Sequence, residues 1–273
     1  MRAFVGLVYH DVHPDNARAY GRMSPSALMY HVSRATFGRH LALIARSGTH
    51  ALGIAALRRP PPLPPPAAGN ERGVALCFDD GWEGAVTRAA AALELREWPA
   101  FFFITTGFIG RPHFATAAQL RRLDPRLFTI GSHGVTHRML SRLAPAEIRA
   151  ELAVSQRVLE DLLGVPVRTL SIPGGAVDRR VVEIARELGY TAIFTSTIGV
   201  NPTAGGSYDI ARIGVTRTTS DARLGRWLAF RLGPERWRKA ALALPKRLLG
   251  MRAYTRVRRA LLGDRGHEHH FEP

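Results

Sequence analysis

Short apolar runs alternate with stretches of helical periodicity along this chain, and this alternation restricts the possible folds more than any other feature. Runs rich in β-branched and aromatic residues cover 3–10, 74–78, 100–105, 127–132, 167–172, 191–196 and 211–216. Parallel strands need long crossover connections that usually hold a helix, so this alternation predicts a parallel α/β sheet or barrel. In 273 residues, seven such units favour a single distorted (β/α)7-type barrel over two small domains.

Three of the connecting segments have the periodicity of amphipathic helices. In 145–164 the apolar residues fall on one stripe, Pro145 suits the first helical turn, and Gly164 suits the end. Segments 36–48 and 178–190 have similar patterns. These segments are therefore expected to form helices that cover the sheet.

The sequence also bears on the cellular compartment. The single cysteine, Cys77, excludes an internal disulfide, which fits a reducing environment. The segment 1–12 lacks the long apolar stretch and small-residue cleavage site of a secretory signal. No run reaches the ~18 apolar residues of a membrane span. We therefore expect a soluble, cytoplasmic protein.

Positive charge is concentrated near the C-terminus. The formal net charge is +16, and residues 223–259 hold twelve Lys/Arg against one acid. Residues 223–262 mix these cations with Trp, Phe, Tyr and Leu, and would form three short helices with a basic and an apolar face. This composition is typical of segments that lie on a membrane surface, and its apolar share argues against specific nucleic-acid binding. The alternative is packing against the barrel.

These features divide the chain into two parts. We expect a barrel domain over 1–220 and a basic amphipathic C-terminal segment over 221–273 with a disordered end. The tract HEHH at 267–270 resembles a metal-binding sequence, but its place in a polar tail favours disorder.

Residues with metal-binding or acid–base chemistry stand at the ends of the predicted strands. His10 ends the first run, Asp79 and Asp80 follow the second, His133 follows the fourth, and the Pro-Gly-Gly turn at 173–175 follows the fifth. Functional sites of parallel α/β folds assemble at the carboxyl ends of the strands. These residues are therefore expected to meet at one edge.

Two adjacent carboxylates need an explanation, because like charges repel and burying either one unpaired is costly. Asp79 and Asp80 either both face water or hold a cation between them. His133 and His137 have the spacing that places two imidazoles on one face of a helical turn, where they can share a zinc ion. A carboxylate as third ligand would leave a position for water. Two surface histidines in a loop are the alternative.

The sequences CFDDG (77–81) and HGVTH (133–137) resemble the first two motifs of the polysaccharide deacetylase family, the NodB-like carbohydrate esterases of family 4. The resemblance covers roughly residues 3–216. It implies a metal-dependent hydrolase that removes acetyl groups from N-acetylated sugars of a surface polysaccharide or its precursor. An O-acetyl esterase with the same site and a non-catalytic saccharide-binding relative remain alternatives.

The resemblance also implies roles for individual residues. Asp79 would be the general base, while Asp80, His133 and His137 would bind Zn²⁺ or another divalent transition metal. The order of the two acids comes from the family alone. The backbone N–H of Gly174 matches the family's oxyanion donor.

The sequence departs from the family pattern at two places. Ser171 stands where the third motif carries an arginine that braces the catalytic Asp, and Arg168 is three residues away on a strand, so it points to the opposite face. The late strand that bears the acid histidine has no match after residue 216. However, LVYHDV (7–12) resembles the start of the circularly permuted exopolysaccharide deacetylases, which implies that His10 is the acid.

Three residues are candidates for contacting the saccharide. Trp82 follows the Asp pair and either lines the sugar cleft or packs at the start of a helix, while Pro173 and Gly175 belong to the third-motif turn. The other histidines lack companions at ligand spacing: His13, His31, His40 and His50.

Overall fold

A computed structural model describes residues 3–15, 28–58, 72–203 and 209–239. Each of the seven apolar runs coincides with a strand or overlaps one: β1 (Ala3–Tyr9), β5 (Arg72–Phe78), β6 (Ala100–Ile104), β7 (Phe128–Ser132), β8 (Thr169–Ser171), β9 (Ala192–Phe194) and β11 (Arg212–Gly214). Neighbouring strands are parallel, in the spatial order β11, β1, β5, β6, β7, β8, β9. The observed strands are mostly shorter than the predicted runs, because the ends of the runs already belong to the connecting loops.

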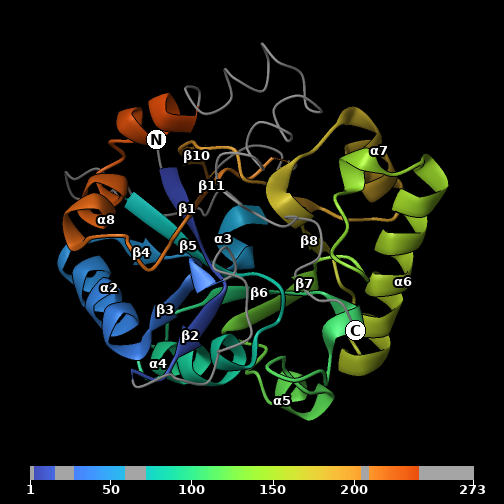
Figure 1. Ribbon diagram of the computed structural model, residues 1–273, viewed down its shortest axis with the longest axis horizontal. Helices are drawn as coiled ribbons and strands as arrows, with labels where there is room; N and C mark the ends of the chain where they lie inside the picture. Colours follow the sequence, from blue (N-terminus) through green and yellow to red (C-terminus); the bar gives the residue numbers. More distant parts are fainter. Residues whose placement is uncertain (1–2, 16–27, 59–71, 204–208, 240–273) are drawn as a thin grey trace, which may run out of the picture.

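The sheet curls so that its two ends approach each other (Figure 1). β11 pairs with β1, and Ile210, just before β11, bridges to Phe194 at the end of β9. The backbone N–H of Ile210 donates to Ile193 (2.8 Å) and that of Thr195 donates to Ile210 (2.9 Å). The expected distorted (β/α)7-type barrel is thereby confirmed.

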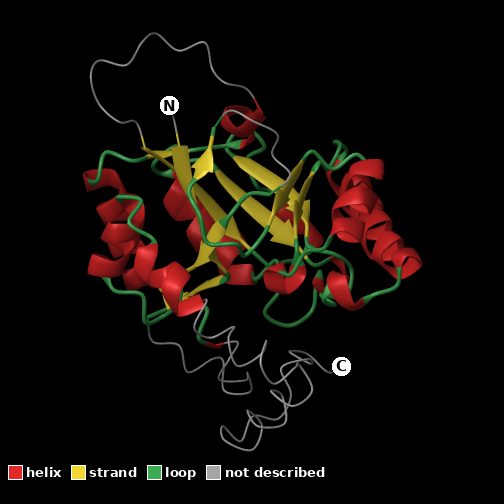
Figure 2. Cartoon of the chain, turned by 90° about the horizontal axis from the view of Figure 1, so that it is seen from above, coloured by secondary structure: helices red, strands yellow, loops and turns green. Residues whose placement is uncertain are grey.

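Helices cover the outside of the curled sheet (Figure 2). They are α2 (Arg34–Arg46), α3 (Ile54–Arg58), α4 (Ala90–Glu94), α5 (Ala117–Arg121), α6 (Pro145–Leu163), α7 (Arg179–Glu187) and α8 (Asp221–Leu228). A π-helical turn over Ala85–Ala89 leads into α4, and short 3-10 turns cover Thr106–Phe108, Leu140–Arg142 and Pro173–Gly175.

Local signals fix the ends of the predicted helices. α6 begins with Pro145 at its first position and ends at Gly164, which is left-handed with φ 70°. α7 is capped by the side chain of Asp178, which accepts from the N–H of Val181 (3.1 Å). α2 begins two residues before the predicted start, because the Ser33 side chain caps it.

Short strands outside the seven runs were not predicted. β2 (Asp11–His13) and β3 (His31–Ser33) form a separate parallel pair, β4 (His50–Ala51) pairs with β5, and β10 (Asn201–Pro202) pairs antiparallel with β1. Strands of two or three residues are too short to show a periodicity in the sequence.

Two apolar clusters face opposite sides of the strands. The larger one joins Leu76 and Phe78 of β5 to side chains of α2 and α6, so it fills the layer between sheet and helices. The smaller one contains Ala75 and Cys77 of β5 with phenylalanines of β6 and β9, so it fills the inside of the curl. Alternate residues of β5 thus point outward and inward, and Asp79 continues the inward series.

The C-terminal segment begins inside the packed structure. In α8, Leu224, Trp227 and Leu228 are all buried and belong to the larger cluster. The expected boundary at residue 220 therefore precedes a helix that is part of the core. Residues 233–239 continue as a helical turn on which Trp237 is 79% exposed.

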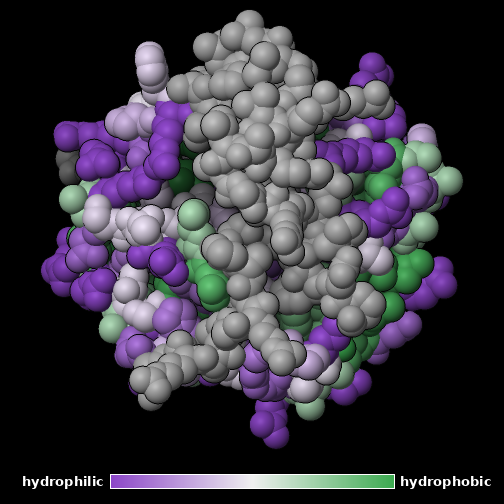
Figure 3. Space-filling view, in the orientation of Figure 1, coloured by the Kyte–Doolittle hydropathy of each residue, from purple (hydrophilic) through white to green (hydrophobic). Residues whose placement is uncertain are grey.

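The visible surface is mainly hydrophilic, with smaller apolar areas on the side where α6 lies (Figure 3). Val154 and Val158 of α6 are both exposed. Among the described residues, the structure contains no helix that is long and apolar enough to cross a membrane.

Candidate active site

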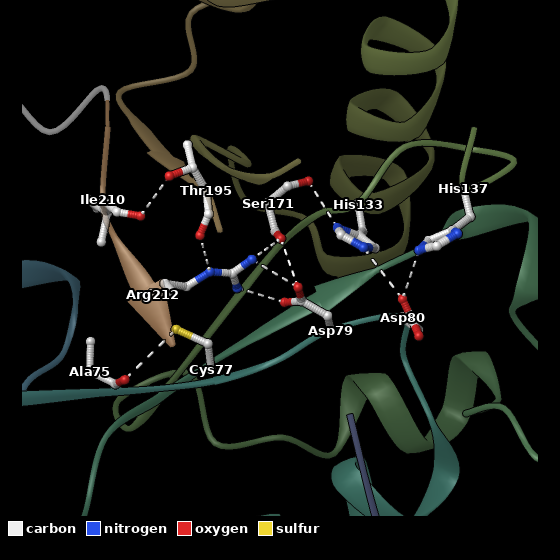
Figure 4. A network of polar contacts seen from close by, with 10 residues as sticks. All are labelled: Ala75, Cys77, Asp79, Asp80, His133, His137, Ser171, Thr195, Ile210 and Arg212. Carbon is white, nitrogen blue, oxygen red and sulfur yellow. Dashed lines mark hydrogen bonds and ion pairs between the residues drawn. The ribbon is translucent and has the colours of Figure 1, made fainter. Parts of the chain in front are cut away.

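The carboxyl ends of the strands bring together the residues that the sequence singled out (Figure 4). Asp79 and Asp80 follow β5, His133 follows β7, and Ser171 ends β8. They are joined by Arg212, the first residue of β11, which the sequence analysis did not single out. The expectation that strand-end residues meet at one edge is therefore met for the Asp pair and the histidines.

A sharp turn separates the two acids. Asp80 has φ 74° and Gly81 has φ 89°, so two consecutive residues are left-handed. Aspartate tolerates this conformation better than most residues, and glycine adopts it freely. Because of the turn, the Asp79 carboxylate faces Arg212 while the Asp80 carboxylate faces the histidines.

Asp79 is held by a buried arginine that the sequence analysis did not identify. Arg212 donates from Nη1 to Oδ1 (2.8 Å) and from Nη2 to Oδ2 (2.9 Å). The Ser171 hydroxyl donates to Oδ2 (3.0 Å) and accepts from Arg212 Nη2 (2.8 Å). Burial raises the pKa of Asp79, but Arg212 outweighs it, so the net pKa lies below the usual range.

Residues of the barrel wall hold Arg212 in place. Its Nε donates to the carbonyl of Thr195 (3.1 Å), and its guanidinium lies 5.6 Å from the Phe103 ring and 5.7 Å from the Phe194 ring. The charge that the third motif lacks at Ser171 is therefore supplied by β11. Arg168 is exposed, as expected, and donates to Gly189 instead.

A charged residue inside an apolar run was the signal that could have revealed Arg212. The run ARIGVT at 211–216 holds one cation between apolar residues. An arginine buried in a strand needs an anionic partner, and Asp79 was already placed at a strand end.

Asp80, His133 and His137 converge on one point. Asp80 Oδ1 lies 3.3 Å from Nε2 of His133 and 3.2 Å from Nε2 of His137. The three ligand atoms lie within 4.8 Å of one another. Among the described His, Cys, Asp and Glu residues, these three form a group that could hold a metal ion.

The two histidines do not share a helical turn, so that part of the sequence argument was wrong. Residues 133–137 form a loop, in which Gly134 has φ 76° and His137 has φ 61°. The left-handed residues curl the loop so that both imidazoles reach Asp80. Their convergence comes from loop conformation, which the spacing of the histidines alone does not reveal.

The hydrogen bond of His133 to Ser171 indicates that a positive charge belongs between His133 and Asp80. His133 Nδ1 lies 2.9 Å from the carbonyl oxygen of Ser171, and a carbonyl can only accept, so Nδ1 carries the hydrogen. In the neutral imidazole, Nε2 then directs a lone pair at a carboxylate oxygen of Asp80. A cation between the two atoms would turn this repulsion into ligation, and His/Asp donors suit zinc and related divalent metals.

The pKa values agree with this requirement. Burial raises the pKa of Asp80, but His137, His133 and His10 outweigh it, so the carboxyl has a pKa well below its usual range. Burial lowers the pKa of His137, but Asp80 outweighs it and the net pKa is raised. The pocket thus stabilises a carboxylate together with a positive partner.

Trp82 is buried, so the prediction that it lines the sugar cleft does not fit the structure. It is 2% exposed, and its ring stacks on Phe114 with centroids 4.4 Å apart. His31 meets its ring edge-on at 4.5 Å. Its Nε1 donates to Asp80 Oδ2 (3.0 Å). The structure fits the alternative of a packed residue, and Trp82 in addition orients the Asp80 carboxylate.

His10 follows β1 and reaches the same region. Burial lowers its pKa, while Asp80 and Asp79 act in the opposite direction. Its ring lies 4.7 Å from the ring of Tyr30, which is partly exposed. Its buried Nδ1 makes no hydrogen bond within the described part of the chain. A catalytic role is one explanation for a buried polar atom of this kind.

The Pro-Gly-Gly turn lies beside the acids but presents little side-chain surface. Pro173 is buried, which argues against the predicted contact between its ring and a saccharide. Gly174 is exposed with φ 65°. Gly175 donates to Ile172 (2.8 Å), and a Cβ at this glycine would lie 1.9 Å from Ser196 Oγ. Only the backbone of this turn can therefore approach a ligand closely.

The remaining histidines do not join the site as ligands. His40 is fully buried, with its Nδ1 3.2 Å from the Tyr9 hydroxyl, and His31 faces Asp11 at 3.6 Å. His13 and His50 lie on β2 and β4. The tract at 267–270 lies outside the described residues.

Comparisons with known proteins agree with the motifs. Residues 67–193 match the family model described as polysaccharide deacetylase. The protein YxkH of Bacillus subtilis is 24% identical over 159 residues, which make up 58% of this chain and 57% of YxkH. The chain spans only about half the length of the curated relatives it matches.

Solved structures show the same fold. The deacetylase PplD of Streptococcus pyogenes, in complex with acetate, has a TM-score of 0.67 at 22% identity, covering 81% of this chain and 96% of PplD. IcaB from Ammonifex degensii has a TM-score of 0.67 at 24% identity, covering 83% of this chain and 97% of IcaB. The matched region, residues 67–193, contains the Asp pair, both loop histidines and the Pro-Gly-Gly turn, so the comparison confirms the resemblance of this part of the chain to the polysaccharide deacetylase family.

Proposed function

We propose that this protein is a metal-dependent hydrolase that removes acetyl groups from N-acetylated sugars of a surface polysaccharide or its precursor. The observation that carries the proposal is the pairing of two sites at one strand edge. Asp80, His133 and His137 converge as a ligand set. Asp79 lies beside them and is bound through both carboxylate oxygens by Arg212.

The ligand set fits Zn²⁺ or another divalent transition metal. An ion held by Asp80, His133 and His137 would supply Lewis acidity toward the acetyl carbonyl and the attacking water. The hydrogen bond from His133 Nδ1 to Ser171 and that from Trp82 to Asp80 would orient two of the three ligands.

Asp79 has the environment of a general base that stays ionised. Its low pKa keeps it a carboxylate at neutral pH. Oδ1 accepts one hydrogen bond from Arg212, which leaves a second lone pair for a proton from the attacking water. Arg212 also fixes the plane of the carboxylate, so the base needs little reorientation during the reaction.

The other two groups would complete amide hydrolysis. Water adds to the acetyl carbon, and the exposed backbone N–H of Gly174 is suited to stabilise the negative charge that develops on the carbonyl oxygen. The C–N bond then breaks, and His10 donates a proton to the departing amine. The products are acetate and a free amino sugar.

Arg212 argues against the alternative that the protein is a non-catalytic saccharide-binding relative. That alternative was motivated by the missing arginine at Ser171, and Arg212 meets Asp79 and Ser171 together. An intact bracing charge supports an active enzyme.

Metal analysis combined with acetate release from chito-oligosaccharides tests the proposal. We expect the wild type to bind one divalent ion and to release acetate. Asp79→Asn should retain the metal and lose about 10²–10⁴-fold in kcat. Acetate release from O-acetylated xylan but not from chito-oligosaccharides would favour the O-acetyl esterase, and metal binding without turnover on either would favour the binding protein.

Location and partners are part of the proposal. A cytoplasmic location would favour a lipid-linked or other intracellular precursor as substrate, and cell fractionation tests it. Within residues 223–262, α8 packs into the core, so the proposed peripheral contact with anionic membrane surfaces falls to the residues after α8. The exposed Trp237, flanked by the exposed Arg236 and Arg238, supports this part.

A further inference from the structure

We propose that Glu151 of α6 is a positioning residue for the metal site, because it holds the histidine loop (residues 133–137) in its ligand-presenting shape. This inference rests on the proposed function, since it concerns the same metal site. Glu151 belongs to none of the motifs discussed above.

The Glu151 carboxylate is buried, and it accepts hydrogen bonds from donors of the loop. Its Oε2 accepts from the backbone N–H of Val135 (2.7 Å) and of Thr136 (3.0 Å). Its Oε1 accepts from the Thr136 hydroxyl. It is only 7% exposed. Hydrogen bonds to a buried charge are stronger than neutral ones, so this carboxylate restrains the middle of the loop.

The opposite side of the histidine loop is held by another backbone segment. The N–H of Thr106 donates to the carbonyl of Gly134 (3.1 Å), and that of Gly107 donates to Val135 (2.9 Å). The carbonyls of the loop are thus fixed by the turn after β6, while its N–H groups are fixed by Glu151. Neither side alone would define the path of the loop.

α6 also fixes the point where the loop begins. Ser155 lies one turn after Glu151, and its hydroxyl is 2.8 Å from that of Ser132 at the end of β7. The Ser132 hydroxyl in turn accepts from the N–H of Gly134 (3.2 Å). One face of α6 therefore contacts both the start and the middle of the loop.

The loop needs such support because of its backbone conformation. His137 is left-handed with φ 61°, which is unfavourable for a residue with a side chain. Residues in such conformations persist when the surrounding structure determines them. If the loop relaxed at His137, its Nε2 would leave the position 3.2 Å from Asp80 Oδ1. Glu151 would therefore act on metal affinity through the geometry of His137.

Titration of the metal-free protein with Co²⁺ tests the inference, because the ion reports both affinity and ligand geometry in its visible spectrum. Glu151→Gln keeps the size of the side chain and replaces an acceptor by a donor. We expect it to weaken Co²⁺ binding about 10–100-fold and to alter the spectrum of the bound ion. Thr136→Val, at an exposed position that loses one donor, should weaken binding by less.

Leu152→Val is the matched control. Leu152 is a fully buried neighbour on α6 that belongs to the core cluster, so the variant lowers thermal stability without removing any of the hydrogen bonds that hold the loop. It should bind Co²⁺ like the wild type. Equal loss of affinity in Leu152→Val and Glu151→Gln would reduce Glu151 to a general stabilising role and overturn the inference.

The remaining outcomes separate the inference from the proposed function. Wild-type affinity and spectrum in Glu151→Gln would overturn the inference alone. If Glu151→Gln does not fold, unchanged affinity in Thr136→Val overturns it equally. Absence of Co²⁺ binding by the wild type would instead overturn the metal-dependent function itself.

Discussion

Asp79 and Asp80 are neighbours in the sequence but have separate surroundings in the structure. The left-handed turn at Asp80 directs one carboxylate to a buried arginine and the other to two imidazoles. Asp79 is therefore paired with Arg212, whereas Asp80 faces two imidazoles with which it could hold a cation. The sequence predicted a cation beside the pair, but it did not predict that Asp79 has an arginine of its own.

The ion pair of Asp79 predicts a large effect of Arg212. Arg212→Met would leave a buried carboxylate without its partner, so we expect the free energy of unfolding to fall by about 3–5 kcal/mol. Arg212→Lys retains the charge but cannot bond both carboxylate oxygens in a fixed plane. It should retain part of the stability and lower kcat on the order of 10²-fold through misplacement of the base. Denaturant unfolding and acetate release measure the two effects.

Arg168→Met is the control for both variants, because Arg168 is exposed at the other end of β8. It should leave stability and kcat nearly unchanged. Wild-type kcat in Arg212→Lys would show that the fixed plane of Asp79 is unimportant.

The indole of Trp82 predicts a change in metal affinity. Trp82→Phe retains an aromatic ring against Phe114 but removes the donor to Asp80 Oδ2. We expect Zn²⁺ affinity to fall about tenfold, because hydrogen bonds that orient a ligand typically matter to that extent. Metal competition with a chromophoric chelator measures it. Unchanged affinity together with a raised KM for chito-oligosaccharides would support the sugar contact that the burial of Trp82 argues against.

At the scale of helices and strands, the sequence predicted the elements that hydrophobic periodicity and helix-end residues specify. The seven runs became strands and the three amphipathic patterns became α2, α6 and α7. The histidine loop could not be predicted, since its shape depends on Glu151 of a helix that follows it in the chain. Arg212 was missed for a related reason: its partner lies 133 residues away in the sequence.

The packing of α2 against β1 predicts a pH-dependent stability. His40 is buried against the Tyr9 hydroxyl, and burial lowers its pKa below 6.5. In the unfolded chain its pKa is about 6.5. As the pH falls below that value, the unfolded chain takes up a proton that the folded chain does not, so stability decreases until the lower, folded pKa is passed.

His40→Gln should reduce this dependence, because the amide can still bond to Tyr9 and does not titrate. We expect a smaller loss of unfolding free energy between neutral pH and pH about 5 than in the wild type. Urea unfolding at several pH values measures it. His50→Gln, at an exposed position of β4, serves as control and should follow the wild type. Equal slopes in wild type and His40→Gln would contradict the prediction.

At the scale of the whole molecule, the segment 210–214 both completes the barrel and delivers Arg212. It lies between β9 and β1, so the last strand in the sequence sits beside the first. His10 at the end of β1 and Arg212 on β11 thereby reach the same site from opposite ends of the chain. Strand order of this kind follows from tertiary pairing and cannot be derived from the local pattern of any one run.

The C-terminal segment gives the last prediction, which concerns attachment to membranes. Removal of everything after Asp221 would expose the core, because Trp227 and Leu228 are buried in it. Truncation after Lys239 retains these residues and still removes six of the twelve Lys/Arg in 223–259.

Each Lys/Arg near an anionic surface is worth about 1 kcal/mol, so the full chain should sediment with phosphatidylserine vesicles at low salt and be released as salt is raised. The truncated chain should sediment far less, and Trp237→Ser should weaken the attachment of the full chain. Equal sedimentation of the full and truncated chains, or equal binding to neutral vesicles, would exclude an electrostatic anchor in residues 240–262.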